Sequence, residues 1–271
     1  MKRLLAIELQ KIWKNRASRI LTISYFTLLS LIALIATVKF DFGNFKIQFA
    51  EQGIFNFPFI WHFNSFIAIY AKIFLGIIIV SMVSNEYSFG TLKQNLIDGM
   101  TKKEFILSKF YTSVLFALIS TVFVFTVSLI LGLIYSSYTE IGIIFSEMEY
   151  LLAYFISLVC FSALCLFVGI LIKRSAFALG FIGIWLIFEI VLVHFKIGFP
   201  DIIKGFLPME AMSQLLIEPI SRLSAIQAVG KMAGVKEVKD YDVHFTTILI
   251  VLTWTAIFVY SSYKIIKKRD L

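Results

Sequence analysis

Six apolar stretches, each about as long as a membrane-spanning helix, constrain this chain more than any other feature of its sequence. A bilayer hydrocarbon core about 30 Å thick needs roughly 20 apolar residues per helix. The stretches are Ile20 to Val38, His62 to Ser84, Phe110 to Tyr135, Leu151 to Ile172, Phe177 to Phe195 and Phe245 to Tyr263. The sequence therefore predicts an all-α membrane protein with six transmembrane helices, built as a single domain over residues 1–271.

Composition and charge agree with this class. Of 271 residues, 59% are hydrophobic and only 15% are charged, and the mean hydropathy is +0.90, outside the range of soluble domains. The net charge of +8 does not indicate a nucleic-acid partner, because Lys and Arg flank the spans. With both termini inside, most of them fall in cytosolic segments, as the positive-inside rule requires. We therefore expect cytosolic termini and contact with the lipid bilayer.

The first segment, Lys2 to Arg19, is amphipathic. We expect a helix that lies on the inner leaflet, although a basic flank that only sets topology is the alternative. The apolar face holds Leu5, Ala6, Leu9, Ile12 and Trp13, and the polar face holds Arg3, Glu8, Gln10, Lys11 and Lys14.

A polar stretch from Asn85 to Lys109 separates the second span from the third. Its first part predicts a short amphipathic helix with Ser88 as a candidate N-cap, and Gly99 ends that helix. Thr101 and Glu104 form a T-x-x-E capping box, which predicts that the next helix begins at about Lys102. The apolar residues at helical spacing are Phe89, Leu92, Leu96 and Ile97, opposite Lys93, Gln94, Asn95 and Asp98.

The outside segments are less regular. The first, Lys39 to Trp61, is rich in aromatic residues, which favour the membrane interface. The second, Ser136 to Tyr150, is acidic, and we expect its three carboxylates to be solvated, with a cation site as the alternative. In the last, Lys196 to His244, prolines predict two short helices, Pro208 to Ile217 and Pro219 to Met232. They either cap the outer end of the bundle or form a dock for an outside partner.

Two ionisable residues lie inside the spans. Lys72 lies about 15 Å from the outer end of the second span, and Glu189 lies about 9 Å inside the fifth span, at a rise of 1.5 Å per residue. Charges at such depths usually face the bundle interior and find a partner, so we expect the two to pair. They either line a pathway through the membrane or form a structural ion pair. Cys160 and Cys165, in the fourth span, are expected to be apolar packing residues rather than a disulfide.

Several kinds of site are missing from the sequence. Gly230 and Lys231 lack the upstream glycine and following hydroxyl of a P-loop. His62, His194 and His244 are too scattered for a local metal site, and no nucleophile has a base near it in sequence. We therefore expect no enzyme activity, catalytic residue, metal or cofactor in this chain.

The stretch from Asn85 to Lys109 resembles a motif of the type-2 ABC transporter permeases, the membrane subunits of a class of bacterial exporters. That family often shows a glutamate, a glycine-threonine pair, a hydrophobic stretch, a Ser/Thr-basic pair and a lysine where the third helix begins. The usual proline before the Ser/Thr-basic pair is absent, and lysine replaces the usual arginine, but the helix break is retained. The matching residues are Glu86, Gly90-Thr91, Leu92 with Leu96 and Ile97, Thr101-Lys102, and Lys109.

This resemblance implies a function. The stretch would be a coupling helix that docks in a groove of a separate ABC ATPase subunit. Two permeases, identical or related, and two ATPases would form the transporter, with ATP and Mg²⁺ bound by the ATPases, in the bacterial cytoplasmic membrane. The largely apolar spans favour an amphipathic cargo, and alternating access would export it. The coupling residues would be Glu86, Phe89, Gly90, Thr91, Leu92, Lys93, Leu96 and Ile97.

Two other functions stay open. One is an ABC-type membrane subunit that moves no cargo and transmits ATP-driven motion to an outside partner on residues 196–244. The other is a stand-alone secondary transporter or membrane scaffold. A secondary transporter often shows an inverted repeat with broken helices at matching positions, and this sequence shows none.

Overall fold

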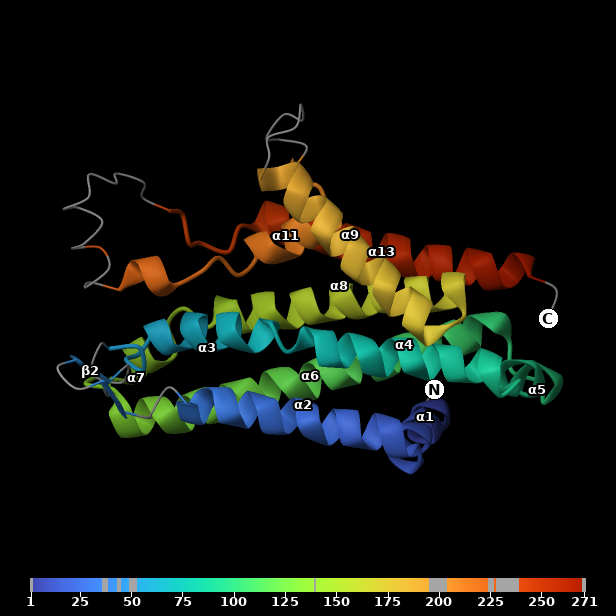
Figure 1. Ribbon diagram of the computed structural model, residues 1–271, viewed down its shortest axis with the longest axis horizontal. Helices are drawn as coiled ribbons and strands as arrows, with labels where there is room; N and C mark the ends of the chain where they lie inside the picture. The colour runs from blue at the N-terminus through green and yellow to red at the C-terminus, as the bar shows by residue number, and fades with distance from the viewer. Residues whose placement is uncertain are drawn as a thin grey trace.

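The computed structural model is a bundle of long helices, most of which run along one axis, whereas helix α9 (Ser175–His194) is inclined to them (Figure 1). It describes residues 2–35, 39–42, 45–48, 53–138, 140–194, 204–223, 227 and 239–269. The long helices are α2 (Arg16–Ile35), α6 (Lys102–Tyr135), α8 (Glu149–Ile172), α9 (Ser175–His194) and α13 (Phe245–Lys268), together with the consecutive pair α3 (Phe59–Ile69) and α4 (Lys72–Ser88).

Within the described residues, four helical segments are long and apolar enough to cross a membrane, or five if α3 and α4 together form one span. The four are Lys102–Tyr135, Ile141–Ile172, Ser175–Val193 and Phe245–Lys268. A helical membrane protein is thereby confirmed at this coarser level. The first predicted span falls on α2, and its residues 36–38 lie outside the described residues.

Helix α8 is the centre of the bundle. Inside the bundle, 78% of its most apolar window is buried, against 33% or less for the other three candidate spans. It contacts α3, α4, α6, α9 and α13. Both cysteines, Cys160 and Cys165, are free and buried on this helix, which confirms their predicted packing role. Small residues at such positions let neighbouring helices approach closely.

The predicted span from His62 to Ser84 is broken, which corrects its description as one helix. Helices α3 and α4 meet at an angle of 44°. The N–H groups of Tyr70 and Ala71 donate to the carbonyls of Ile67 and Ala68, three residues back. This 3₁₀-type tightening interrupts the α-helical hydrogen-bond ladder and produces the bend.

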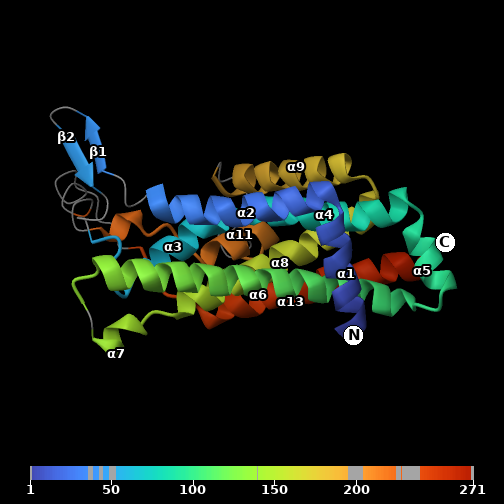
Figure 2. The same cartoon turned by 90° about the horizontal axis from the view of Figure 1, so that it is seen from below.

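The two ends of the bundle differ. Helix α1 (Lys2–Lys14), helix α5 (Thr91–Ile97) and the end of α13 lie at one end (Figure 1). The opposite end holds α7 (Ile141–Ile144) and an antiparallel hairpin of β1 (Lys39–Phe42) and β2 (Phe45–Gln48), seen in Figure 2. Apart from this short hairpin, the regular elements of the described residues are helical, in keeping with the predicted all-α class.

The last outside segment is partly described. Helix α11 (Pro208–Gln214) begins with proline in its first turn, as predicted, and packs on α8, α9 and α13. Met209 and Met212 are buried there. Of the second predicted helix, the structure describes only the short 3₁₀ turn η2 (Ile220–Arg222) and the residues next to it; most of residues 224–232 lie outside the described residues.

Candidate functional site

The loop between α4 and α6 folds largely as its sequence predicts. Helix α5 is present, and Gly99, with φ of +98°, follows its end. Glu104 N–H donates to the Thr101 hydroxyl at 3.2 Å, and Thr101 N–H donates to the Glu104 carboxylate at 2.9 Å, which confirms the capping box. Ser88 as N-cap is wrong, because α4 continues through Ser88. Gly90 precedes α5 instead, in a left-handed conformation with φ of +67°.

The apolar residues of this loop do not share one face, which corrects the expectation of a single apolar stripe. Leu92 is 2% exposed and Leu96 packs against the core, whereas Phe89 and Ile97 are 72% and 71% exposed. Phe89 lies before the Gly90 turn, and Ile97 is rotated by about 140° from Leu92 at 100° per residue. Two large apolar side chains are therefore presented to the surroundings at this end of the bundle, beside the exposed Lys93.

A buried charge cluster lies behind α5. The ammonium group of Lys109, on α6, is 0% exposed and lies 2.5 Å from a carboxylate oxygen of Glu8 on α1. It also lies 2.6 Å from Oε1 of Glu86 on α4. Lys11 on α1 adds a second ammonium group, 2.8 Å from the same Glu86 oxygen and 3.5 Å from Glu8. Two carboxylates and two ammonium groups thus join three helices.

Glu86 extends this cluster to α5. Its second oxygen, Oε2, accepts a hydrogen bond from the Thr91 hydroxyl at 2.5 Å and another from the Asn95 amide at 3.3 Å. Both donors belong to α5. A single carboxylate therefore connects the short helix to α1 and α6, so a displacement of α5 acts directly on a buried ionic network.

The sequence motif contained only part of this cluster. Glu86, Thr91 and Lys109 belong to the motif, but Glu8 and Lys11 were expected on the polar face of α1. Glu8 is instead buried against the bundle. Its carboxylate there pairs with the buried ammonium group of Lys109. The sequence did contain a sign of the special position of Glu8, since it is the only acidic residue among the first 19.

Burial and charge act in opposite directions on Lys11. Burial lowers the pKa of its ammonium group, but the hydrogen bond to Glu86 and the nearby charges of Glu8 and Glu86 outweigh it and raise the pKa. Lys11 therefore stays protonated, and the cluster keeps its balance of charges.

The expected pair of Lys72 and Glu189 is not formed, which corrects that prediction. Glu189 accepts a hydrogen bond from the Trp185 indole, and its other oxygen accepts from the N–H groups of Met209 and Glu210 at 2.9 and 3.1 Å. It therefore satisfies the first turn of α11, where a carboxylate is favoured. Lys72 lies at the start of α4, with its ammonium 5.2 Å from the centroid of the Phe161 ring.

A second polar cluster at the opposite end was not foreseen. Arg222 forms a bidentate ion pair with Glu147, with N–O distances of 3.0 and 2.9 Å, so this acidic loop is not simply solvated. Arg222 also donates to Nδ1 of His62 at 3.1 Å, which leaves Nε2–H of that histidine to donate to the Ile217 carbonyl at 2.7 Å. His62 stacks on Tyr150. These contacts hold the last outside segment on α3 and α8.

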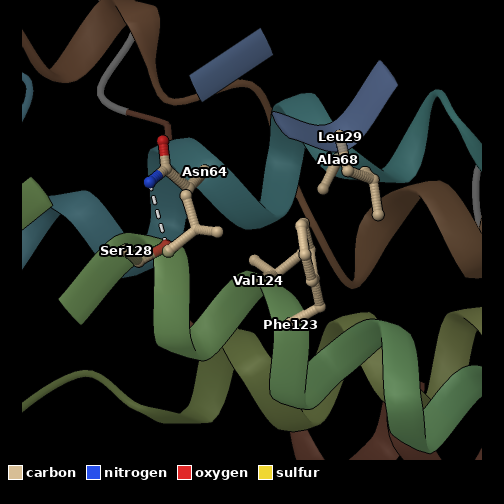
Figure 3. Close-up of a pocket in the computed structure, with 7 residues that line it drawn as sticks. Leu29, Asn64, Ala68, Phe123, Val124 and Ser128 are labelled. Atoms are coloured by element: carbon tan, nitrogen blue, oxygen red, sulfur yellow. Dashed lines mark hydrogen bonds between the residues drawn. The ribbon is translucent and has the colours of Figure 1, made fainter. Parts of the chain in front are cut away.

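A small cavity lies among α2, α3 and α6 (Figure 3). Asn64 points to Ser128 there, and its amide donates to the hydroxyl at 2.9 Å. The volume of ≈ 20 Å³ is that of a single water site. This cavity is therefore too small to hold an amphipathic cargo.

The profile of a family described as "Protein of unknown function (DUF2705)" matches residues 17–271. No curated protein matches the chain in sequence. The family match begins at the second residue of α2 and leaves out α1 entirely.

Proposed function

The chain belongs to the DUF2705 family, and from its geometry we propose that it is the permease subunit of an ATP-driven ABC transporter, with α5 as its coupling helix. The observation that supports this proposal is the set of hydrogen bonds and ion pairs that Glu86 forms. This carboxylate binds α5 through Thr91 and Asn95, α6 through Lys109, and α1 through Lys11. A short helix at one end of the bundle is thereby tied to the helices that a transport cycle has to move.

The mechanism follows from this arrangement. The partner ATPase binds the exposed side of α5, with Lys93 and Ile97, and Phe89 just before this helix. ATP and Mg²⁺ close the ATPase dimer and displace α5. The displacement passes through Glu86 and the charge cluster to α1, α4 and α6, which change packing as rigid elements. Net movement requires ATP binding to favour one conformer by several kcal/mol, so a firmly held α5 is an advantage.

The proposed assembly has two permease copies, identical or related, and two ATPase subunits. Each permease has six spans in the bacterial cytoplasmic membrane, with both termini in the cytosol, and exports an amphipathic cargo. The positions of α1, α5 and the end of α13 at the same end of the bundle support this orientation (Figure 1), together with the distribution of Lys and Arg along the sequence.

A second function is favoured by the opposite end. Arg222 and Glu147, together with Glu189 beneath α11, hold the last outside segment on the bundle. Motion of α3, α8 or α9 therefore reaches that segment directly. A membrane subunit that transmits ATP-driven motion to an outside partner would need this connection.

Replacing both Phe89 and Ile97 with serine tests the proposed docking surface. Both side chains are largely exposed, so we expect the thermal midpoint of the purified chain to stay within about 2 °C. We expect the ATPase that copurifies from native membranes with the parent chain to be lost. Mass spectrometry of the purified complexes measures this loss.

The matched control is Ile141→Ser, an equally exposed isoleucine at the other end of the bundle. It should retain the ATPase. Two results contradict the proposal: an F89S/I97S variant that retains as much ATPase as its parent, or a parent chain with which no ATPase copurifies.

A further inference from the structure

A groove between α6 and α13 opens on the side of the helical bundle and is separate from the site described above. The two helices contact each other along the bundle (Figure 2). The groove has a volume of ≈ 560 Å³, and most of its lining is apolar, including Leu107 and Phe110 of α6 and Leu252 and Ala256 of α13. Its charged lining residue is Lys103.

The length of the groove matches one leaflet of a bilayer. Leu252 and Tyr263 both line it and lie about 16 Å apart along α13 at 1.5 Å per residue. Half of a hydrocarbon core of about 30 Å is about 15 Å. Lys103 and Tyr263 mark the end that lies beside α5, and tyrosine favours the headgroup region. In a bilayer, a groove of this length would reach from headgroup level to about the middle of the hydrocarbon core.

The headgroup end of the groove is positively charged. Lys103 is exposed there. The ammonium of Lys264 lies 4.9 Å from the centroid of the Tyr260 ring, which also lines the groove. The neighbouring carboxylate of Glu104 is engaged by Thr101 in the capping box, and the N-terminus of α6 adds a partial positive charge.

The mouth of the groove is also held in shape. The ammonium of Lys102, at the start of α6, donates to the carbonyls of Lys267 and Arg269 at the end of α13, at 3.3 and 2.9 Å. The two helix ends are therefore bound to each other. These contacts set the width of the groove at this end before any ligand binds.

We propose that this groove binds one anionic phospholipid, with an acyl chain between α6 and α13 and its phosphate at Lys103 and Lys264. An acyl chain fits an apolar groove that has the depth of one leaflet. The two lysines select a negative headgroup over a zwitterionic one. Each lysine near a membrane surface changes affinity for anionic lipid by about fivefold, so the preference is at least that large.

Tryptophan quenching by brominated lipids tests this proposal on the full chain in detergent micelles. Leu252→Trp places a probe at the deep end of the groove, and the signal of the parent chain is subtracted. We expect dibromo-phosphatidylglycerol to quench this probe at a concentration at least fivefold lower than dibromo-phosphatidylcholine. Adding Lys103→Gln and Lys264→Gln should remove the preference, and Ala256→Phe, which fills the groove, should weaken quenching by both lipids.

The control removes two exposed cations at the same end of the bundle, Lys14 and Lys93, by substitution with glutamine. It should retain the preference. Equal quenching by the two lipids, or no effect of Ala256→Phe, overturns the proposal. It is also overturned if Ala256→Phe splits an oligomer on size exclusion with light scattering without changing lipid quenching, because the groove would then be an interface between copies of this chain.

Discussion

Lys109 is the most deeply buried residue of the charge cluster. Its ammonium is fully buried and is held by two carboxylates from different helices. A buried ion pair adds little net stability, since desolvation offsets attraction, but removal of one partner leaves a charge without compensation and costs about 3–5 kcal/mol. The cluster therefore makes the positions of α1, α4 and α6 depend on one another.

We expect Lys109→Met to lower the free energy of unfolding by about 3–5 kcal/mol, measured by denaturant unfolding in mixed micelles. The cost of Lys109→Met combined with Glu8→Gln should be smaller than the sum of the two single costs by more than about 1 kcal/mol, because the residues are in contact. Lys103→Met, an exposed lysine on the same helix, should change stability by no more than about 0.5 kcal/mol. Equal costs for Lys109→Met and Lys103→Met would contradict the cluster's role.

At the scale of a single element, α5 is defined by two glycines more than by its own helix propensity. It has seven residues, too few to be stable alone. Gly90 and Gly99 adopt positive φ values of +67° and +98° at its two ends. Neither has a heavy atom within 4 Å of the position that a Cβ would occupy, so the cost of a substitution there is conformational rather than steric.

Gly90→Ala should therefore destabilise the turn before α5 by about 1–2 kcal/mol, and hydrogen exchange of the α5 amides should become faster. Gly90→Asn should stay closer to the parent, since asparagine adopts the left-handed conformation more readily. Gly142→Ala, an open position without positive φ, is the control and should leave exchange unchanged. Equal exchange rates for the alanine and asparagine variants at position 90 would show that the conformation of Gly90 does not define α5.

Much of this element was predictable, because its signals are local. The capping box depends on residues three apart, and a glycine at a helix end acts within one turn. Ser88 was assigned wrongly because an N-cap and the last turn of a preceding helix look alike in sequence. The exposure of Ile97 depends on which side of α5 faces α4, and the exposure of Phe89 on how α4 ends at the Gly90 turn. Neither is specified within the loop.

In the whole molecule, the bundle is joined to extramembrane segments at both ends. One end holds α1 and α5 through Glu86 and Lys109, and the other holds the last outside segment through Arg222 and Glu147. The second pair is about one-quarter exposed, so solvent screens it. Its importance lies in position, because it joins a segment after α9 to the loop before α8.

We expect Arg222→Met to release this segment. The substitution removes the hydrogen bonds of Arg222 to Glu147 and His62, and His62 then holds the Ile217 carbonyl less firmly. Limited proteolysis should cut residues 204–223 faster, with α5 still protected. Lys239→Met, which removes a more exposed ion pair with Glu218, should have a smaller effect. A charge exchange, Arg222→Glu with Glu147→Arg, should recover part of the protection. Unchanged cleavage in the Arg222→Met variant would contradict the role of this pair.

The amino-acid sequence was sufficient to predict the membrane class, most helix positions and the capping of α6. These features depend on the apolar length of a segment and on residues within one turn of one another. The break between α3 and α4, the partner of Glu189 and the contact of Glu8 and Glu86 with Lys109 became visible in the three-dimensional structure alone. Charges far apart in sequence meet only when helix packing sets their positions, and the cost of burying a charge then selects which of them pair.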